Sequence, residues 1–348
     1  MSHLTFGEAG VVGLLQGVTE LFPLSSLGHS VLIPALVGGS WAQDLNVSKP
    51  ESPYLAFIVG MHVATALAMI IYFWRDWVRI IGAFFASIKH VISPAPGTYR
   101  WQPQTTDQLL AWMIIVATIP VGIAGLALEH LFRTTFSKPV PTAVFLAVNG
   151  VILLGGERLR RRRADTEAEQ MAADEAAVAQ RQRTAVAVGG GRAAGGAGRH
   201  SAGQRALKQQ QAGMAVQADE RIVQQGFLGG LLLGSLQILA LLPGISRDGI
   251  VMVGGMFRGL TRQDAARFSF LLSAPVILAA GVLKIPDLTG PLGAGVRGQI
   301  VFGSILAGVG AYLALRFLVR YLSDPTKTLT PFGIYCLVVG IGSAIYLA

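Results

Sequence analysis

Long apolar stretches alternate with short polar segments along most of the chain. Each stretch approaches the roughly 20 residues that a helix needs to cross a bilayer, so the pattern predicts about six membrane-spanning helices. The predicted spans cover residues 55–74, 109–128, 142–155, 268–283, 300–319 and 332–347. Residues 78–91 form a further apolar segment, which is either a short span or an amphipathic helix.

Two other apolar stretches contain helix-breaking residues and lack the pattern of a straight span. The first, residues 4–37, contains Pro23 and Gly28, and the second, residues 227–257, is broken at Pro243. Half-helices of this kind occur in membrane proteins where protein or water satisfies the freed backbone groups. We therefore predict an all-α polytopic membrane protein with about six transmembrane helices and two re-entrant helical hairpins.

The two broken stretches indicate a weak internal repeat. A shift of 220 residues aligns Pro23 with Pro243 and Ser26 with Ser246. Similar breaks in both halves of a membrane protein are typical of inverted repeats with a site at their interface, and a chance match of a few residues is the alternative. The predicted units are a first membrane repeat over 1–156, a linker over 157–225 and a second membrane repeat over 226–348.

The linker differs in composition from the rest of the chain. It begins with the basic cluster 158–163, continues through an Ala/Glu/Gln-rich stretch that can form a helix, and includes the Gly/Ala-rich residues 189–198. The Gly/Ala-rich part has too little apolar mass to pack, so we expect it to be flexible. Because Lys and Arg concentrate in the cytoplasmic loops of membrane proteins, the basic cluster predicts a cytoplasmic linker.

Composition and charge agree with a membrane protein. The chain has 348 residues, of which 52% are apolar and 14% charged, against roughly 25% charged in soluble domains. The net charge of +9 comes from basic residues beside the predicted spans, so we expect membrane lipids and no nucleic acid as partners. The single cysteine, Cys336, cannot form an intramolecular disulfide and is expected to be a buried apolar residue.

Ionisable groups inside the apolar stretches are the first candidates for function. Each costs at least about 2.5 kcal/mol on insertion scales, and Glu20, His29 and Arg247 stand out. Gln16 lies four residues before Glu20, so the two share one helix face. Glu20 can orient a nucleophile, accept a proton or bind a divalent cation, and a structural ion pair with Arg247 is the alternative. His62 is interpreted as a packing residue, with a place near the site as the alternative.

The turn of the first hairpin contains two serines. A serine becomes a nucleophile when a base or a metal activates it, and either Glu20 or His29 can act as the base for Ser25 or Ser26. The turn also exposes backbone N–H groups that can bind an anion if a helix begins there. Helix N-capping by serine is the structural alternative.

The turn of the second hairpin has the residues of an anion site. Gly244 permits close backbone approach, and the planar guanidinium of Arg247 suits phosphate oxygens. Ser246 and Asp248 flank the arginine, and an ion pair of Arg247 with Asp248 or Glu20 is the alternative. Together the two turns suit an amphiphilic substrate whose phosphates lie at the membrane surface.

Both turns carry motifs of a known family. The first has the sequence QGVTELFPLSSLGH, which resembles the first signature of the undecaprenyl-pyrophosphate phosphatases, also called the bacitracin-resistance proteins. The second has the sequence LLPGISRDG, which resembles their second signature, and RQDAARFSFLLSAPVILAAG is similar to the stretch that follows it. The resemblance covers both halves. It implies a bacterial plasma-membrane enzyme that hydrolyses undecaprenyl diphosphate to the monophosphate, which is the lipid carrier of peptidoglycan synthesis.

The resemblance also implies a divalent cation, Mg²⁺ or Ca²⁺, and a site that opens to the extracytoplasmic side. The predicted catalytic residues are Glu20, Ser26, His29 and Arg247. The predicted substrate-binding residues are Gln16, Ser25, Gly244, Ser246, Arg247 and Asp248. For the cation, Glu20 is the predicted ligand, with Asp248 as a second candidate. Ser26 is the candidate nucleophile, and attack by a water that His29 activates is the alternative.

The chain departs from the family pattern at three positions. Gln16 replaces a glutamate, Leu27 replaces a threonine and Asp248 replaces a serine. The first change removes a carboxylate and the third adds one, so we expect them to affect cation binding and rate. A transporter or flippase of a phosphorylated lipid or small anion, built on the same repeats, is the alternative function, followed by a catalytically silent scaffold. For the oligomeric state, the assembly that we consider is a homodimer.

Overall fold

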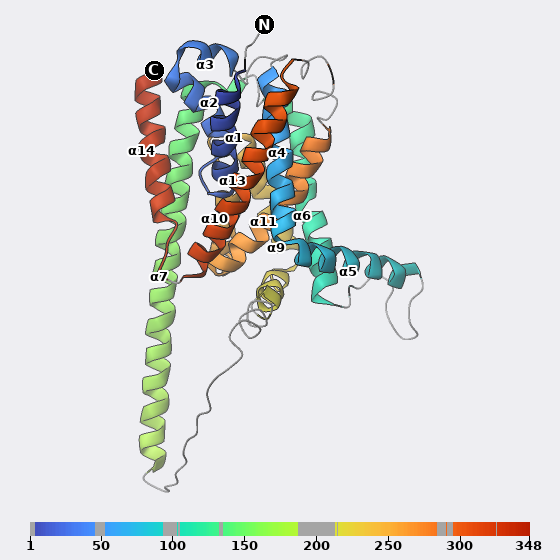
Figure 1. Cartoon of the computed structure of the whole chain (residues 1–348). Coiled ribbons are helices and arrows are strands. Elements are labelled where there is room, and N and C mark those ends of the chain that lie inside the picture. The colour runs from blue at the N-terminus through green and yellow to red at the C-terminus, as the bar shows by residue number, and fades with distance from the viewer. Residues whose placement is uncertain are drawn as a thin grey trace, which may run out of the picture.

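The computed structural model describes residues 4–45, 53–92, 105–131, 135–186, 215–283, 295–324 and 326–348, with the single residues 103, 213 and 290. Within these residues the regular structure is helical throughout (Figure 1). The helices of the first half are α1 (Phe6–Leu21), α2 (Ser26–Val37), α3 (Gly39–Asp44), α4 (Pro53–Tyr72), α5 (Trp74–Ile92), α6 (Thr106–Leu131) and α7 (Pro139–Val186). Those of the second half are α9 (Gly226–Ser235), the 3₁₀ helix η2 (Leu236–Leu241), α10 (Arg247–Phe257), α11 (Arg262–Leu283), α13 (Arg297–Ser323) and α14 (Thr330–Leu347).

The helices confirm a multi-pass membrane fold. Five of those described are long and apolar enough to cross a bilayer, namely α6, α7 as far as Arg163, α11, α13 and α14. The number rises to seven if each of two bent pairs counts as one span, α4 with α5 and the helix Ala215–Val223 with α9 and η2. The prediction of about six spans lies within this range.

For residues 78–91 the sequence allowed either a short span or an amphipathic helix, and α5 is the amphipathic helix. It bends by 85° from α4 and runs across the lower end of the bundle (Figure 1). Trp74, Val78 and Phe85 are exposed along one side, while Arg79 on another side pairs with Asp107 and Asp219. An apolar stripe opposite a charged one suits a helix that lies in the membrane interface.

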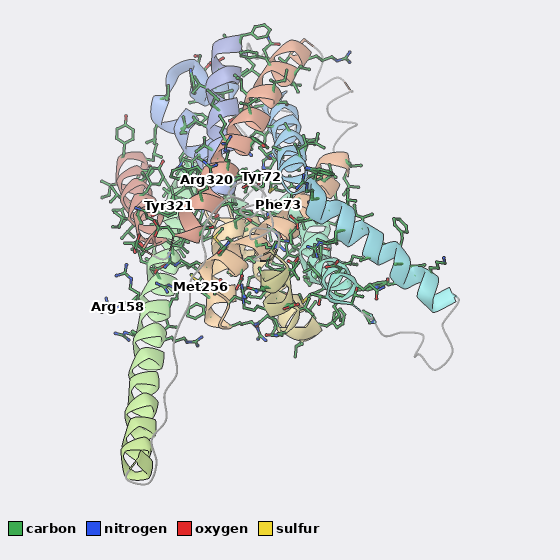
Figure 2. All side chains as sticks on the ribbon, turned by 60° about the horizontal axis from the view of Figure 1, so that its bottom comes forward. Tyr72, Phe73, Arg158, Met256, Arg320 and Tyr321 are labelled. Carbon is green, nitrogen blue, oxygen red and sulfur yellow. The ribbon has the colours of Figure 1, made fainter. Side chains whose placement is uncertain are left out.

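Helix α7 is much longer than the predicted span 142–155. It continues to Val186 without a break and projects from the lower end of the bundle beyond Arg158 (Figures 1 and 2). The Ala, Glu, Gln and Arg residues after Gly156 are good helix formers, so the linker boundary at residue 157 does not interrupt the helix. Residues 189–198, which we expect to be flexible, lie outside the described residues.

The end of the linker is folded, which differs from the expected boundary at residue 225. Residues Ala215–Val223 form a helix in which Asp219 and Ile222 are fully buried. Asp219 accepts a hydrogen bond from Arg267 Nε at 2.8 Å and pairs with Arg79. The chain therefore re-enters the folded body about ten residues earlier than its composition indicates.

The two predicted hairpins are present as pairs of short helices. At 1.5 Å per residue, the 16 residues of α1 and the 11 of α10 are too short for a hydrocarbon core of about 30 Å. The α1–α2 pair lies in the upper part of the bundle and α10 in the lower part (Figure 1). The halves of the chain intermix, because α1 packs along α13 and α7 packs along α14. A Cβ on Gly17 of α1 would lie 2.3 Å from the Ala307 oxygen of α13, so this crossing depends on small residues.

Candidate active site

The first turn brings the chain sharply into helix α2. Ser25 has φ +68°, a region that residues other than glycine seldom occupy. Its Oγ accepts a hydrogen bond from the Gly28 N–H at 3.2 Å, so Ser25 is the N-cap of the helix that begins at Ser26. The capping role of a serine in this turn is confirmed. Unusual backbone conformations cluster at functional sites.

The second turn has the same organisation. Ser246 is the N-cap of α10, and its Oγ accepts the Gly249 N–H at 3.1 Å. Gly244 has φ +111°, and a Cβ there would lie 2.5 Å from the Thr142 oxygen. Only glycine fits this position, because the turn lies directly against α7.

The tips of the two hairpins meet. Gly244 N–H donates to Ser25 Oγ at 3.1 Å, so one hydroxyl accepts backbone hydrogen bonds from both turns. A Cβ on Gly28 would lie 3.0 Å from the Gly244 Cα. Helices α2 and α10 therefore begin at adjoining turns, so their N-termini lie close together. Helix N-termini favour anions. The hydrogen bond between Ser25 and Gly244 connects the two turns. Contact of either residue with the substrate stays a prediction.

Asn149 of α7 also connects the two turns, through hydrogen bonds of its side-chain amide. The sequence did not identify it as a site residue. Asn149 Nδ2 donates to the Pro23 oxygen at 2.9 Å, and Asn149 Oδ1 accepts the Ser246 N–H at 3.0 Å. The amide is fully buried. An uncharged polar residue in the apolar span 142–155 was the signal that could have identified it, because buried amides need partners.

Glu20 lies at the centre of the polar contacts at the first turn. Its Oε2 accepts a hydrogen bond from Ser26 Oγ and one from Gln16 Nε2 at 2.8 Å. His62 Nε2 lies 3.4 Å from the same oxygen and 3.2 Å from Gln16 Nε2. His62 Nδ1 donates to the Ile58 oxygen at 2.9 Å, so Nε2 is the ring nitrogen that faces Glu20 and Gln16. The structure therefore places His62 at the site, the alternative to the packing role that we preferred.

Both ring nitrogens of His29 have hydrogen-bond partners other than Ser26. Its Nδ1 donates to the Ser25 oxygen at 2.8 Å, and its Nε2 accepts from the Tyr335 hydroxyl at 2.9 Å. The two rings are also stacked, with centroids 5.7 Å apart. Of the two candidate bases, Glu20 is the one that forms a hydrogen bond to Ser26.

Arg247 and Asp248 are adjacent but have different surroundings. Arg247 Nη1 is buried and has no hydrogen-bond partner in the part of the chain that the structure describes. Neither Glu20 nor Asp248 lies within ion-pair distance of it, in contrast to the structural alternative. Asp248 Oδ1 accepts from Ser269 Oγ at 2.6 Å and Ser273 Oγ at 2.7 Å. A buried guanidinium nitrogen without a partner suits a site that binds an anion.

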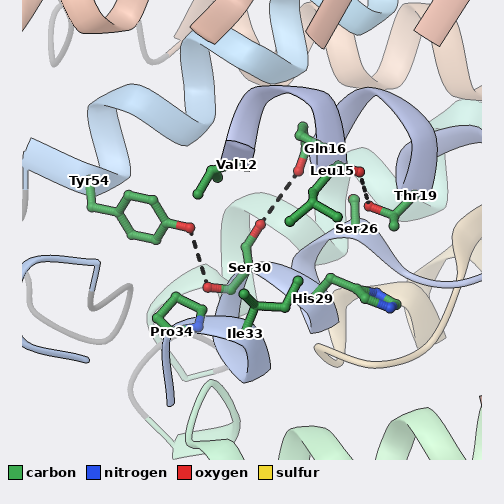
Figure 3. Close-up of a pocket in the computed structure, with 10 residues that line it drawn as sticks. All are labelled: Val12, Leu15, Gln16, Thr19, Ser26, His29, Ser30, Ile33, Pro34 and Tyr54. Atoms are coloured by element: carbon green, nitrogen blue, oxygen red, sulfur yellow. Dashed lines mark hydrogen bonds between the residues drawn. The ribbon is translucent and has the colours of Figure 1, made fainter. Parts of the chain in front are cut away.

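A small cavity lies between α1 and α2 (Figure 3). Its volume is about 10 Å³, which is room for about one water molecule. Figure 3 shows the imidazole of His29 pointing away from Ser30 and Tyr54. The lining residues are Val12, Leu15, Gln16, Thr19, Ser26, His29, Ser30, Ile33, Pro34 and Tyr54. Ser26 and Gln16 thus border an internal space next to the Glu20 contacts.

Comparison with known proteins supports the resemblance of the two motifs. The family model described as "Bacitracin resistance protein BacA" matches residues 9–196 and 203–342. A protein of Mycolicibacterium paratuberculosis named undecaprenyl-diphosphatase is 54% identical over 347 residues, which covers 100% of this chain and 99% of the relative.

More distant relatives have the same kind of name. A Frankia alni protein named undecaprenyl-diphosphatase 2 is 50% identical over 98% of this chain and 97% of its own length. A Burkholderia orbicola protein of that name is 35% identical over 95% of this chain and 92% of its own length. With matches that run through both hairpins and both halves, the chain belongs to the BacA family of bacitracin resistance proteins.

Proposed function

We propose that this protein is an integral-membrane phosphatase that hydrolyses undecaprenyl diphosphate to undecaprenyl phosphate and phosphate, and so recycles the lipid carrier of cell-wall synthesis. The hydrogen bond from Ser26 Oγ to Glu20 carries the proposal, because it pairs a candidate nucleophile with a base at the start of a helix. The names of the relatives favour the same reaction over lipid-phosphate transport.

The diphosphate would bind between the two turns. Arg247, whose Nη1 has no partner among the described residues, supplies a planar donor for the phosphate oxygens. The first turns of α2 and α10 add helix N-termini, which favour negative charge. Charge stabilisation and positioning are the main requirements of phosphoryl transfer, and the two hairpins supply both.

In the proposed reaction Ser26 Oγ attacks the terminal phosphorus. The bond from Ser26 Oγ to phosphorus forms, the bond from phosphorus to the bridging oxygen breaks, and undecaprenyl phosphate leaves. The hydroxyl proton passes to the Glu20 carboxylate, which already accepts a hydrogen bond from it. Water then hydrolyses the phosphoserine and releases phosphate. Since His29 Nε2 is engaged by Tyr335, Glu20 is the better candidate for the base.

A divalent cation fits this site only if the substrate completes its coordination. Among the described residues no three His, Cys, Asp or Glu side chains lie together as a metal site, and Asp248 is held by two serines. Mg²⁺ is commonly bound by one or two carboxylates together with substrate phosphates, so Glu20 alone can supply the protein ligand. The cation would neutralise charge on the diphosphate when bound.

We further propose that the site opens to the extracytoplasmic side of a bacterial plasma membrane. The basic cluster that follows Arg158 lies at the lower end of the bundle, where α7 leaves it (Figure 2), and the positive-inside rule makes this end cytoplasmic. The α1–α2 hairpin lies toward the opposite end (Figure 1). A homodimer stays a prediction.

The test is phosphate release from undecaprenyl diphosphate by the purified full-length protein in detergent. The assay runs with Mg²⁺, with Ca²⁺ and with a chelator, on the wild type and on Ser26→Ala and Arg247→Ala variants. We expect cation-dependent release that both variants lose. Absence of release from a folded wild-type sample under every condition would overturn the phosphatase and favour transport of a lipid phosphate.

A further inference from the structure

The carboxylate of Asp248 points into the protein, toward α11. Its Oδ1 accepts hydrogen bonds from two hydroxyls, Ser269 Oγ at 2.6 Å and Ser273 Oγ at 2.7 Å. The serines lie four residues apart, so they share one face of α11. Asp248 is 2% exposed and both serines are buried. Two donors on one oxygen fix the direction of this side chain.

Arg247 precedes Asp248 in the same first turn of α10 and points elsewhere. Successive residues of a helix are about 100° apart around its axis and do not face each other. Arg247 forms no ion pair with Asp248, and its buried Nη1 is without a partner among the described residues. Holding Asp248 against α11 therefore sets the rotation of α10 about its axis, and with it the direction of Arg247.

Helix α11 is a fixed support for this contact. Its first turns carry Asp264, which accepts two hydrogen bonds from Arg221 at 2.7 and 2.9 Å. They also carry Arg267, which donates to Asp76 and Asp219 at 2.8 Å each. These ion pairs connect α11 to α5 and to the helix Ala215–Val223. Ser269 and Ser273 follow Arg267 in the same helix, so they lie on a segment that two other elements hold in place.

We propose that Asp248, Ser269 and Ser273 form a positioning clamp that directs Arg247 toward the phosphates of the substrate. The clamp rests on the proposed function of Arg247 as the phosphate ligand. In this proposal Asp248 contacts neither substrate nor cation and acts through its neighbour. Small misplacements of a binding group cost up to about 10²-fold in rate, so the clamp is expected to affect both binding and turnover.

The test measures two quantities on the full-length protein in detergent. The first is the dissociation constant for inorganic pyrophosphate by titration calorimetry, and the second is kcat/KM for undecaprenyl diphosphate. The variants are Asp248→Ala, Asp248→Asn, Arg247→Ala, the double variant Asp248→Ala with Arg247→Ala, and Ser269→Ala with Ser273→Ala. A buried serine on α14, Ser343→Ala, is the matched control, and thermal unfolding identifies variants that have lost their fold.

A clamp that acts through Arg247 has a specific signature. We expect Asp248→Ala and the double serine variant each to weaken pyrophosphate binding about 10-fold, within the range set by misplacement. Asp248→Asn is expected to recover most of the affinity, because an amide oxygen accepts the same two hydroxyls. With Arg247→Ala already present, Asp248→Ala is expected to add less than about 2-fold, since the two residues act as one unit.

Contrary results separate the two proposals. The clamp is overturned if Asp248→Ala binds pyrophosphate as tightly as the wild type, if Asp248→Asn is as damaging as alanine, or if the effects of the Asp248 and Arg247 variants multiply. A wild type that binds pyrophosphate through Arg247 and does not hydrolyse the lipid would overturn the proposed enzyme and keep the clamp. Absence of Arg247-dependent pyrophosphate binding would overturn both.

Discussion

The Ser25 hydroxyl accepts the backbone N–H of Gly244, a residue 219 positions further along the chain, at 3.1 Å. The same oxygen caps its own helix through Gly28 N–H. The Ser25 side chain therefore caps α2 and also connects the first turn to the turn of the second hairpin. This contact brings the helix that begins at Ser26 and the helix that begins at Arg247 to a common point.

Glu20→Gln should lower kcat by about 10²–10⁴-fold, the usual contribution of a general base. The amide keeps the shape of the side chain but cannot take the Ser26 proton. Phosphate release from undecaprenyl diphosphate is the measurement. The matched control is Glu8→Gln in the same helix, because Glu8 accepts hydrogen bonds from Thr5 at the start of α1 and contacts no site residue among those described. Equal activity of the Glu20 variant and the control would exclude Glu20 as the base.

Asn149→Ala should destabilise the protein, because it removes the acceptor of the buried Ser246 N–H and the stronger of two donors to the Pro23 oxygen. Each buried group left unsatisfied costs about 1–3 kcal/mol. The expected result is a lower Tm in detergent together with weaker phosphate release. Asn149→Asp keeps the acceptor for Ser246 but loses the donor to Pro23 and Cys336 and adds a buried carboxylate, so its Tm should also fall. An unchanged Tm in the alanine variant would show that the tie is dispensable.

Gly244→Ala should abolish activity or folding. The added methyl would lie 2.5 Å from the Thr142 oxygen, at a backbone φ of +111°, where an L-residue is strained. Gly125→Ala is the control, since a Cβ on this α6 glycine meets nothing within 4 Å, and alanine in a helix is favoured by about 0.5–1 kcal/mol. Thermal unfolding and phosphate release measure both variants. A fully active Gly244→Ala protein would contradict the close contact of the turn with α7.

Asp219→Ala should lower stability more than a surface change does. Asp219 is fully buried and pairs with both Arg79 and Arg267, and breaking a buried pair by removing one partner costs about 3–5 kcal/mol. The control is Asp324→Ala, a partly exposed aspartate whose carboxylate contacts Thr326. Tm in detergent and protease resistance of the linker report the difference. Equal values for the two variants would mean that the docked end of the linker adds nothing to stability.

Local sequence determined the helices and the places where they break. The spans follow from runs of apolar residues, because a bilayer core of roughly 30 Å requires them wherever a helix crosses. Pro23 and Pro243 indicated the two turns because proline disfavours a helix interior, although Pro34, Pro120 and Pro275 lie inside helices and show that proline alone does not fix a break. The pairing of Gln16 with Glu20 also followed from spacing alone, since residues four apart share a helix face. The two motifs around these breaks were enough to identify the family.

Tertiary structure decided which polar groups meet. Asn149, Tyr335 and His62 reach the two turns from α7, α14 and α4, and no periodicity within those helices shows which neighbour they will face. Asp248 is the clearest case. Its place next to Arg247 predicted a residue that binds substrate or cation, whereas the packing of α10 on α11 makes its carboxylate accept hydrogen bonds from two serines. Helix crossings join residues that lie on different helices, up to 306 positions apart for His29 and Tyr335. Their register depends on side-chain packing across the bundle, which a single local pattern does not contain.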